Sequence, residues 1–171
     1  MSWTIYESPL GPLTLEGGAG GITRLWFPGR AGELDERDHD PAALAGAVAQ
    51  LEAYFAGERR TFDLPLELGG TPFQQQVWAH LRRIPYGTTI AYSQLAKRLG
   101  RPDIVRAVGA AVGRTPVPIV VPCHRVVAVD GALTGYGGGL HRKQALLGLE
   151  RRAVGGEGQA PAWAFRQLAL L

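Results

Sequence analysis

The chain has 171 residues, of which 46% are hydrophobic and one is a cysteine. This length suits one domain or two small ones, and a lone cysteine excludes an internal disulfide and a cysteine-rich zinc site. The sequence has no apolar run of about 18 residues that would span a membrane, and its N-terminus lacks the features of a secretory signal. We therefore expect a cytoplasmic monomer that needs no metal and no cofactor.

Charge is unevenly distributed along the chain. Residues 1–70 carry 5 basic and 11 acidic side chains, whereas residues 71–171 carry 13 basic and 4 acidic ones. A strongly basic half favours a polyanionic partner such as nucleic acid. Two oppositely charged faces that only attract each other would produce the same pattern, so charge alone leaves both interpretations open.

The first part of the chain predicts a small sheet. Strands at 3–6 and 13–15 flank the turn-rich segment 8–12, as in a β-hairpin, and residues 22–27 predict a third strand.

A helix and a further strand are predicted next. Asp40 and Pro41 have the residue types of a helix start, and apolar residues at helical spacing continue to Gly57. Alternating apolar residues over 62–68 predict a half-buried strand, in which Pro65 indicates a sheet edge. No residue pattern in this part indicates catalysis.

Glycines 69 and 70 suggest a domain boundary, and a helical region follows. Thr71, Pro72 and Gln74 predict an N-cap, a first-turn proline and a capping box, for a helix that runs to the Pro85-Tyr86-Gly87 turn. Helices over about 91–99 and 104–112 are joined by a tight turn, which is typical of a helix-turn-helix. Many such helix pairs bind nothing, so this pattern alone does not identify a DNA-binding protein.

These patterns predict three regions. Residues 1–70 form an α/β domain, residues 71–152 a second domain, to which the motifs described below assign DNA binding and catalysis, and residues 153–171 a C-terminal tail. The tail begins as a Gly-rich link and ends in an apolar segment that is a candidate for a short docking helix.

The only cysteine lies at a break between apolar segments. Residues 119–121 predict a strand that ends at Pro122, and residues 126–129 resume the strand pattern. Cys123 is followed by His124, and a neighbouring imidazole or cation favours a reactive thiolate. A buried, inert cysteine is the alternative. Because adjacent residues on a strand face opposite sides, His124 should reach the sulfur only through a bend or a bridging water.

Two further features lie downstream of the cysteine. Residues 133–139 form a Gly-rich turn around Tyr136, which suits close approach to a flat ligand, although an ordinary loop has the same composition. Glu150 lies on a closing helix; such carboxylates are usually solvated, but this one could orient His124.

Together these motifs resemble the O6-alkylguanine-DNA alkyltransferases, also called methylated-DNA–protein-cysteine methyltransferases. The resemblance is dense from Phe73 to Glu150 and weaker before it. It is carried by Phe73, Val77-Trp78, Ile84-Pro85, Gly87, Thr89, Tyr92, Arg106-Ala107-Val108-Gly109, Pro122-Cys123-His124-Arg125-Val126, Gly135-Tyr136-Gly137-Gly138-Gly139, Lys143 and Leu146-Leu147-x-Leu149-Glu150.

The resemblance implies a ribonuclease-H-like α/β N-terminal domain and a mainly helical, winged-helix-like C-terminal domain that contains the helix-turn-helix. It also implies direct-reversal DNA repair, in which an alkyl group passes irreversibly from O6-alkylguanine in double-stranded DNA to Cys123. The target atom is stacked inside the duplex, so the base must first be flipped out. Because a thioether forms, each molecule is expected to act once.

The resemblance also implies catalytic roles. Cys123 accepts the alkyl group, and His124, oriented by Glu150, removes the thiol proton through a water. Tyr92 helps to rotate the phosphate and donates a proton to the departing guanine.

Further roles concern DNA and the base. Arg106 fills the gap left by the flipped nucleotide, and small residues let the recognition helix enter the minor groove. The residues implied at the DNA are Arg106, Ala107, Gly109, Ala110 and Thr115, and those implied at the substrate pocket are Pro118, Val126, Tyr136, Gly137, Gly138 and Lys143.

Thr115 departs from the family pattern, which usually has Asn at this position. A hydroxyl offers one donor and no amide geometry, so we expect slower alkyl transfer with little change in DNA affinity. The zinc ligands of some relatives are also absent. A non-catalytic protein that recognises alkylated bases and a cysteine hydrolase that uses Cys123 and His124 are the alternatives.

Overall fold

The computed structural model describes residues 1–131, 133 and 135–155. The chain divides into two compact units: residues 1–69 with 116–120, and residues 70–115 with the described residues from 121 onward. Residues 116–120 lie within the predicted second domain, but Leu25 N donates a hydrogen bond to Pro116 O (3.0 Å), which joins this segment to the first unit. Most of the predicted tail, residues 156–171, lies outside the described residues.

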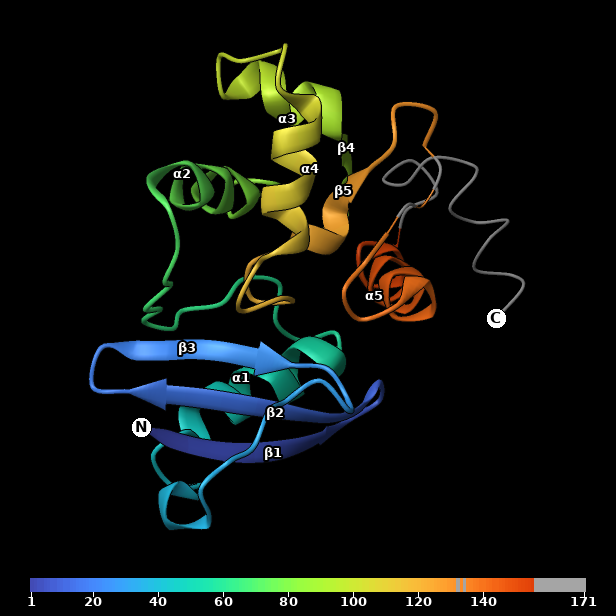
Figure 1. The fold of residues 1–171 in the computed structure, drawn as a ribbon. Coiled ribbons are helices and arrows are strands. Elements are labelled where there is room, and N and C mark those ends of the chain that lie inside the picture. Colours follow the sequence, from blue (N-terminus) through green and yellow to red (C-terminus); the bar gives the residue numbers. More distant parts are fainter. Residues whose placement is uncertain (132, 134, 156–171) are drawn as a thin grey trace. The chain divides into compact units, whose positions relative to one another are not determined.

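The first unit contains a three-stranded antiparallel sheet, shown in blue in Figure 1. Its strands β1 (Ser2–Ser8), β2 (Gly11–Gly18) and β3 (Gly21–Trp26) lie in chain order. The predicted hairpin and third strand are therefore confirmed. In the β1–β2 hairpin Gly11 has a φ of 99°, which an L-residue adopts with difficulty.

Helix α1 (Ala45–Phe55) packs on one face of this sheet. Its Phe55 ring lies 6.2 Å from the Tyr6 ring, and Leu51 is fully buried. The helix begins later than predicted, because Asp40 caps only a preceding turn, in which its Oδ1 accepts from Ala43 N at 3.1 Å. A short 3-10 helix, η1 (Glu36–Asp38), lies in the predicted acidic loop.

The predicted strand over 62–68 is wrong. Side-chain burial does alternate along this segment, but only a parallel bridge between Ile22 and Leu66 forms. Ile22 N donates to Pro65 O, and Glu67 N donates to Ile22 O, each at 2.9 Å. A proline has no N–H to extend the ladder, which explains why pairing stops at Pro65.

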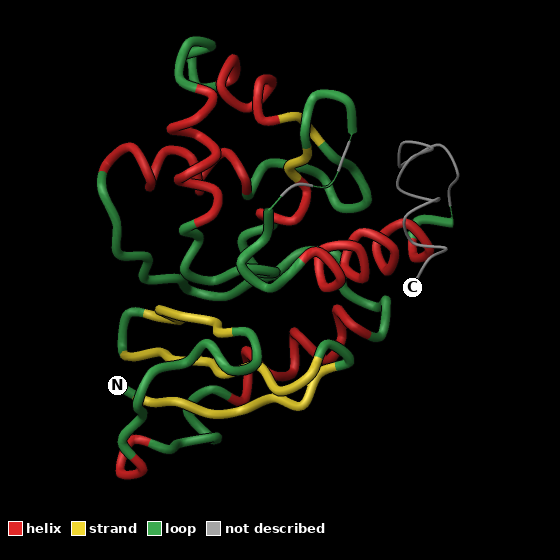
Figure 2. The backbone as a smooth tube through the Cα atoms, turned by 45° about the vertical axis from the view of Figure 1, so that its right-hand side comes forward, coloured by secondary structure: helices red, strands yellow, loops and turns green. Residues whose placement is uncertain are grey.

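The second unit is mainly helical, as the secondary-structure colours of Figure 2 show. Helix α2 (Pro72–Leu81) has the predicted capping box between Thr71 and Gln74. It ends at Leu81, three residues before Ile84, and a turn leads on to Gly87. The remaining elements are β4 (Ile90–Ala91), α3 (Tyr92–Arg98), α4 (Val105–Gly113), η2 (Cys123–Arg125), β5 (Val126–Val127) and α5 (Leu140–Ala153).

Helices α3 and α4 form the predicted helix-turn-helix. The turn between them begins at Gly100, whose φ is 74°. Leu95 on α3 and Val108 on α4 are fully buried, and Trp78 Nε1 on α2 donates to Ala111 O at 2.9 Å. The predicted fold class, a small α/β unit plus a helical unit with a helix-turn-helix, is confirmed.

The predicted strand over 119–121 is wrong, and the strand after the cysteine is shorter than predicted. Ile119 has a φ of 75°, so the chain turns there. Prolines before and after this segment remove amide donors that a ladder needs. Strand β5 pairs in parallel with β4 only through Ile90 with Val126 and Ala91 with Val127. No helix in the described part of the chain is long and apolar enough to cross a membrane.

Candidate active site

Cys123 begins the 3-10 turn η2, and its side chain is almost completely buried. Burial raises the pKa of the thiol, whereas hydrogen bonds from Thr115 and Tyr136 and the charge of Lys143 lower it; the net shift is upward. The thiol therefore keeps its proton at neutral pH, and a nucleophilic sulfur requires a base.

Thr115 lies against that sulfur from the end of α4. Its hydroxyl donates to Val112 O at 2.7 Å and also hydrogen-bonds to the Cys123 thiol. A hydroxyl has one proton, so it cannot donate to Val112 O and to the sulfur at the same time. Once the thiol is ionised, the same hydroxyl must leave Val112 if it is to donate to the sulfur.

His124 is fully buried and bound to a carboxylate. Its Nε2 lies 2.6 Å from Glu150 Oε2, whereas its buried Nδ1 has no hydrogen-bond partner among the described residues. Burial lowers the pKa of the imidazole, Glu150 raises it, and Arg125 and Lys143 lower it further; the net pKa is lowered. The imidazole is therefore neutral at pH 7, with a proton on Nε2 and an accepting lone pair on Nδ1.

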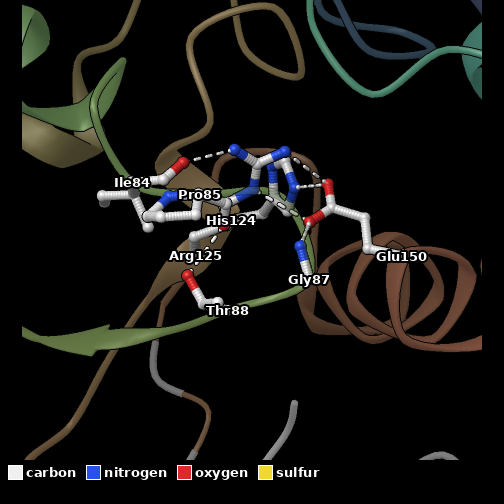
Figure 3. A network of polar contacts seen from close by, with 7 residues as sticks. All are labelled: Ile84, Pro85, Gly87, Thr88, His124, Arg125 and Glu150. Carbon is white, nitrogen blue, oxygen red and sulfur yellow. Dashed lines mark hydrogen bonds and ion pairs between the residues drawn. The ribbon is translucent and has the colours of Figure 1, made fainter. Parts of the chain in front are cut away.

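Glu150 accepts hydrogen bonds from His124, Arg125 and Gly87, as Figure 3 shows. Besides His124, Arg125 donates to both oxygens at 2.8 and 3.0 Å, and Gly87 N donates to Oε1 at 3.2 Å. Burial raises the pKa of this carboxyl, but His124 and Arg125 lower it more, so its net pKa lies well below the usual range. The carboxylate stays ionised and holds the imidazole in one tautomer.

Lys143 projects from the same face of α5, because residues seven apart on a helix share a face. It is fully buried, and its Nζ donates to Val126 O at 2.6 Å. Burial lowers the pKa of Lys143 to about 8, although the charge of Cys123 opposes this. Nζ lies 6.0 Å from the ring centroids of both Tyr92 and Tyr136.

The Gly-rich turn places Tyr136 beside the thiol. Gly139 N donates to Tyr136 O at 2.9 Å, and Arg142 Nη1 donates to Gly138 O at 2.8 Å, so the turn is fixed at both sides. Burial and the neighbouring Cys123 raise the pKa of the Tyr136 hydroxyl well above its usual range. This hydroxyl therefore remains a proton donor.

The predicted DNA-contacting residues lie on α4. Arg106, Ala107 and Ala110 are exposed. Gly109 faces Tyr92 at the start of α3, and a Cβ on Gly109 would lie 3.8 Å from the Tyr92 ring. Small side chains thus leave this part of α4 uncovered.

The structure brings together most of the predicted chemistry. Cys123 lies with Thr115, Tyr136 and Lys143, and His124 pairs with Glu150. Pro118 instead belongs to the first compact unit, so its place in a substrate pocket remains a prediction.

Arg125 and the turn that contains Gly87 are functional candidates that the sequence reasoning did not assign. Two signals could have found them: Arg125 directly follows His124, and the spacing Ile84-Pro85-x-Gly87 recurs in the family pattern. Among the described residues, no group of three His, Cys, Asp or Glu side chains could hold a metal ion.

A helix-turn-helix unit with a buried thiol next to a histidine–carboxylate pair defines a class of DNA-binding proteins that carry a cysteine nucleophile. Residues 72–152 match the profile described as "6-O-methylguanine DNA methyltransferase, DNA binding domain", and residues 1–68 match the "ribonuclease-like domain" of the same proteins. The chain belongs to the 6-O-methylguanine DNA methyltransferase family.

Individual relatives agree with this assignment. The methylated-DNA–protein-cysteine methyltransferase of Mycobacterium bovis is 52% identical over 148 residues, which cover 85% of this chain and 89% of the relative. The constitutive enzyme of Bacillus subtilis is 46% identical over 156 residues, 87% of this chain and 94% of its own. A crystal structure of Mycobacterium tuberculosis OGT in complex with DNA superposes with a TM-score of 0.84 at 48% identity, covering 95% of this chain and 96% of that one.

Proposed function

We propose that this chain repairs DNA by direct reversal, transferring an alkyl group irreversibly from O6-alkylguanine to Cys123. The observation that carries the proposal is the arrangement around His124, whose Nε2 is bound to Glu150 and whose Nδ1 is left to accept a proton. The adjacent thiol is protonated at rest, so a base of this kind is what the reaction needs.

The chemistry begins with ionisation of the sulfur. The thiol proton passes to His124 Nδ1 through a water, and the resulting imidazolium is stabilised by the Glu150 carboxylate. Lys143, Tyr136 and Thr115 stabilise the thiolate by charge and hydrogen bonds.

Transfer itself is a single displacement. The sulfur forms a bond to the alkyl carbon, the bond between that carbon and guanine O6 breaks, and the electron pair stays on guanine. Tyr92 donates a proton to the departing base. The product is a thioether on Cys123, and none of the described residues around it offers a route back to the thiol.

Access to a stacked base requires that the nucleotide be flipped out, at a cost of roughly a few kcal/mol. Arg106 occupies the gap in the stack, while Ala107, Gly109 and Ala110 let α4 approach the minor groove. Phosphate contacts from basic side chains offset the cost of flipping. The DNA complex of the M. tuberculosis relative supports DNA as the partner here.

The extruded base is held by residues that lie close to the sulfur. We assign this pocket to Tyr136, the backbone of Gly137 and Gly138, and the Val126 backbone that Lys143 supports through its hydrogen bond.

We place this reaction in the cytoplasm, because a chain with one cysteine that serves as the nucleophile suits a reducing compartment. We also expect the protein to act as a monomer.

Mass spectrometry tests the function directly. The protein is mixed with a duplex oligonucleotide that carries O6-methylguanine, digested, and the peptide containing Cys123 is weighed. We expect that this peptide alone gains one methylene, with one methyl group per protein molecule, and that Cys123→Ser gains none. Binding without a mass change would favour a recognition protein, and repeated turnover of a non-DNA substrate would favour a hydrolase.

A further inference from the structure

Arg125 is a buried arginine to which the mechanism above gives no part. Its side chain is 7% exposed. Nε donates to Glu150 Oε1 at 2.8 Å and Nη2 donates to Oε2 at 3.0 Å, which is the paired geometry that binds a carboxylate most strongly. The third donor, Nη1, reaches Ile84 O at 2.7 Å.

These contacts give Glu150 a complete set of donors (Figure 3). Oε1 accepts from Arg125 Nε and Gly87 N, and Oε2 accepts from Arg125 Nη2 and His124 Nε2. A fully buried carboxylate is stable only when its charge and lone pairs are satisfied. Arg125, unlike His124 and the Gly87 amide, carries a permanent positive charge.

The arginine also connects Glu150 to the turn before β4. That turn supplies Ile84 O to Arg125 and Gly87 N to Glu150, and Thr88 Oγ1 closes it by donating to Pro85 O at 2.7 Å. The guanidinium therefore fixes the position of the carboxylate, because it donates two hydrogen bonds to the carboxylate and a third to the turn.

We propose that Arg125 is a positioning residue for the repair reaction: it keeps Glu150 charged and oriented, so that His124 carries its proton on Nε2 and presents Nδ1 as the base. This inference rests on the proposed function, since it explains why His124, the base of that reaction, is neutral and protonated on Nε2. A purely structural clamp would stabilise the fold without setting the pH dependence of methyl transfer.

The charges around the His124–Glu150 pair determine in which direction its apparent pKa moves when Arg125 is replaced. His124 faces Glu150, Arg125 and Lys143, while the Tyr86 ring lies 5.5 Å from Arg125 Cζ. Cys123 and Tyr136 lie near Lys143. Replacing Arg125 by a neutral residue removes one of two cations near the His124–Glu150 pair. Protonation of the pair then becomes easier, so its apparent pKa rises, by about one unit or more for an adjacent charge.

Nitrogen NMR of histidine-labelled protein tests this without any DNA. We would compare the wild type with Arg125→Met, Arg125→Gln and Arg125→Lys, and use Arg152→Met, an exposed arginine on α5, as the matched control. Wild-type His124 should show a protonated Nε2 and an unprotonated Nδ1. The neutral variants should titrate at higher pH by about one unit or more, whereas Arg125→Lys, which keeps the charge, should titrate near the wild type.

Single-turnover methyl transfer as a function of pH provides the second readout. The acidic limb of the rate profile should move to higher pH in Arg125→Met and Arg125→Gln, and Arg125→Lys should lower the plateau while leaving the limb in place. An unmoved limb and an unmoved His124 titration in a folded neutral variant would overturn the proposal. If the wild type transfers no methyl group, the proposed function fails, and the NMR comparison still decides the role of Arg125.

Discussion

At the scale of single residues, the nucleophile is a protonated thiol at rest, so it needs a base before it can react. Burial raises the pKa of Cys123 more than Thr115, Tyr136 and Lys143 lower it. The same neighbours stabilise the anion once a base has taken the proton. Reactivity is thus set by side chains from three segments that surround one sulfur.

Thr115 provides the first prediction at this scale. We expect Thr115→Asn to speed alkyl transfer, because an amide can donate to the sulfur while still bonding the backbone of α4. Thr115→Val should slow it roughly tenfold or more, the cost of losing a hydrogen bond to a charged group. Single-turnover rates and duplex affinity measure both effects, with affinity expected to change little. An Asn variant with the wild-type rate would show that the departure from the family pattern has no kinetic consequence.

The second prediction concerns stability against pH. Burial lowers the pKa of His124 from 6.5, and the Glu150 pKa is lowered from 4.5 because His124 and Arg125 outweigh its burial. The unfolded chain therefore binds more protons than the folded one as the pH falls, so stability decreases below about pH 6.5 and again through pH 4.5. Urea unfolding between pH 7.5 and 4 measures this.

Variants separate the contribution of His124 to this pH dependence from that of the other titratable groups. His124→Gln should flatten the dependence between pH 7 and 6, whereas His80→Gln, which removes a more accessible imidazole, should keep it. Equal slopes in all three proteins would contradict the assignment.

At the scale of secondary-structure elements, short turns fix the site more than long helices do. The turn before β4 holds Arg125 and Glu150, and η2 replaces the strand predicted around the cysteine. This bend lets Cys123 and His124, adjacent in sequence, take part in separate hydrogen-bond networks.

Gly87 tests the importance of that turn. Its φ is 78°, and a Cβ there would lie 2.9 Å from Val154 Cγ1. Gly87→Ala should cost about 1–2 kcal/mol for the backbone conformation alone, plus the clash, and it should also slow transfer by displacing Glu150. The control is Gly100→Ala, which has a φ of 74° but nothing within 4 Å. Urea unfolding should show a clearly larger loss of stability for Gly87→Ala than for Gly100→Ala. Equal losses of stability would mean that the Val154 side chain moves aside at no cost.

Helix α4 yields a prediction about DNA. Arg106→Ala should slow transfer from a duplex roughly tenfold or more, because flipping costs a few kcal/mol that Arg106 helps to offset. Reaction with the free O6-methylguanine nucleoside should be unchanged, since no stack has to be opened. Arg30→Ala, an exposed arginine of the first unit, serves as the control. A similar loss on both substrates would place Arg106 in the chemistry instead.

At the scale of the whole molecule, the charge asymmetry predicts salt-sensitive binding. Six exposed basic side chains of the second unit are candidates for phosphate contacts: Arg82, Arg83, Lys97, Arg98, Arg101 and Arg114. Each neutralised phosphate contributes about −0.9 to the slope of log affinity against log salt concentration. We expect a slope of roughly −3 or steeper, measured by fluorescence anisotropy on a duplex, and a slope near zero would contradict this electrostatic account.

The sequence by itself determined the elements whose signals are local. The hairpin at 2–18, the capping box at Thr71 and the helix-turn-helix follow from turn chemistry and apolar periodicity over a few residues. The order of the motifs around Cys123 indicated the family for the same reason, because residue identity and spacing are properties of the chain alone.

Tertiary structure decided what depends on partners far apart in sequence. Residues 62–68 alternate like a strand, yet Pro65 cannot extend a ladder beside β3. The segment 119–121 is apolar but turns at Ile119, and Arg125 gains its importance only when Glu150, 25 residues away, is folded against it. Burial and pairing of charges, which set the protonation state of this site, arise from such long-range contacts, and a linear pattern of residues does not encode them.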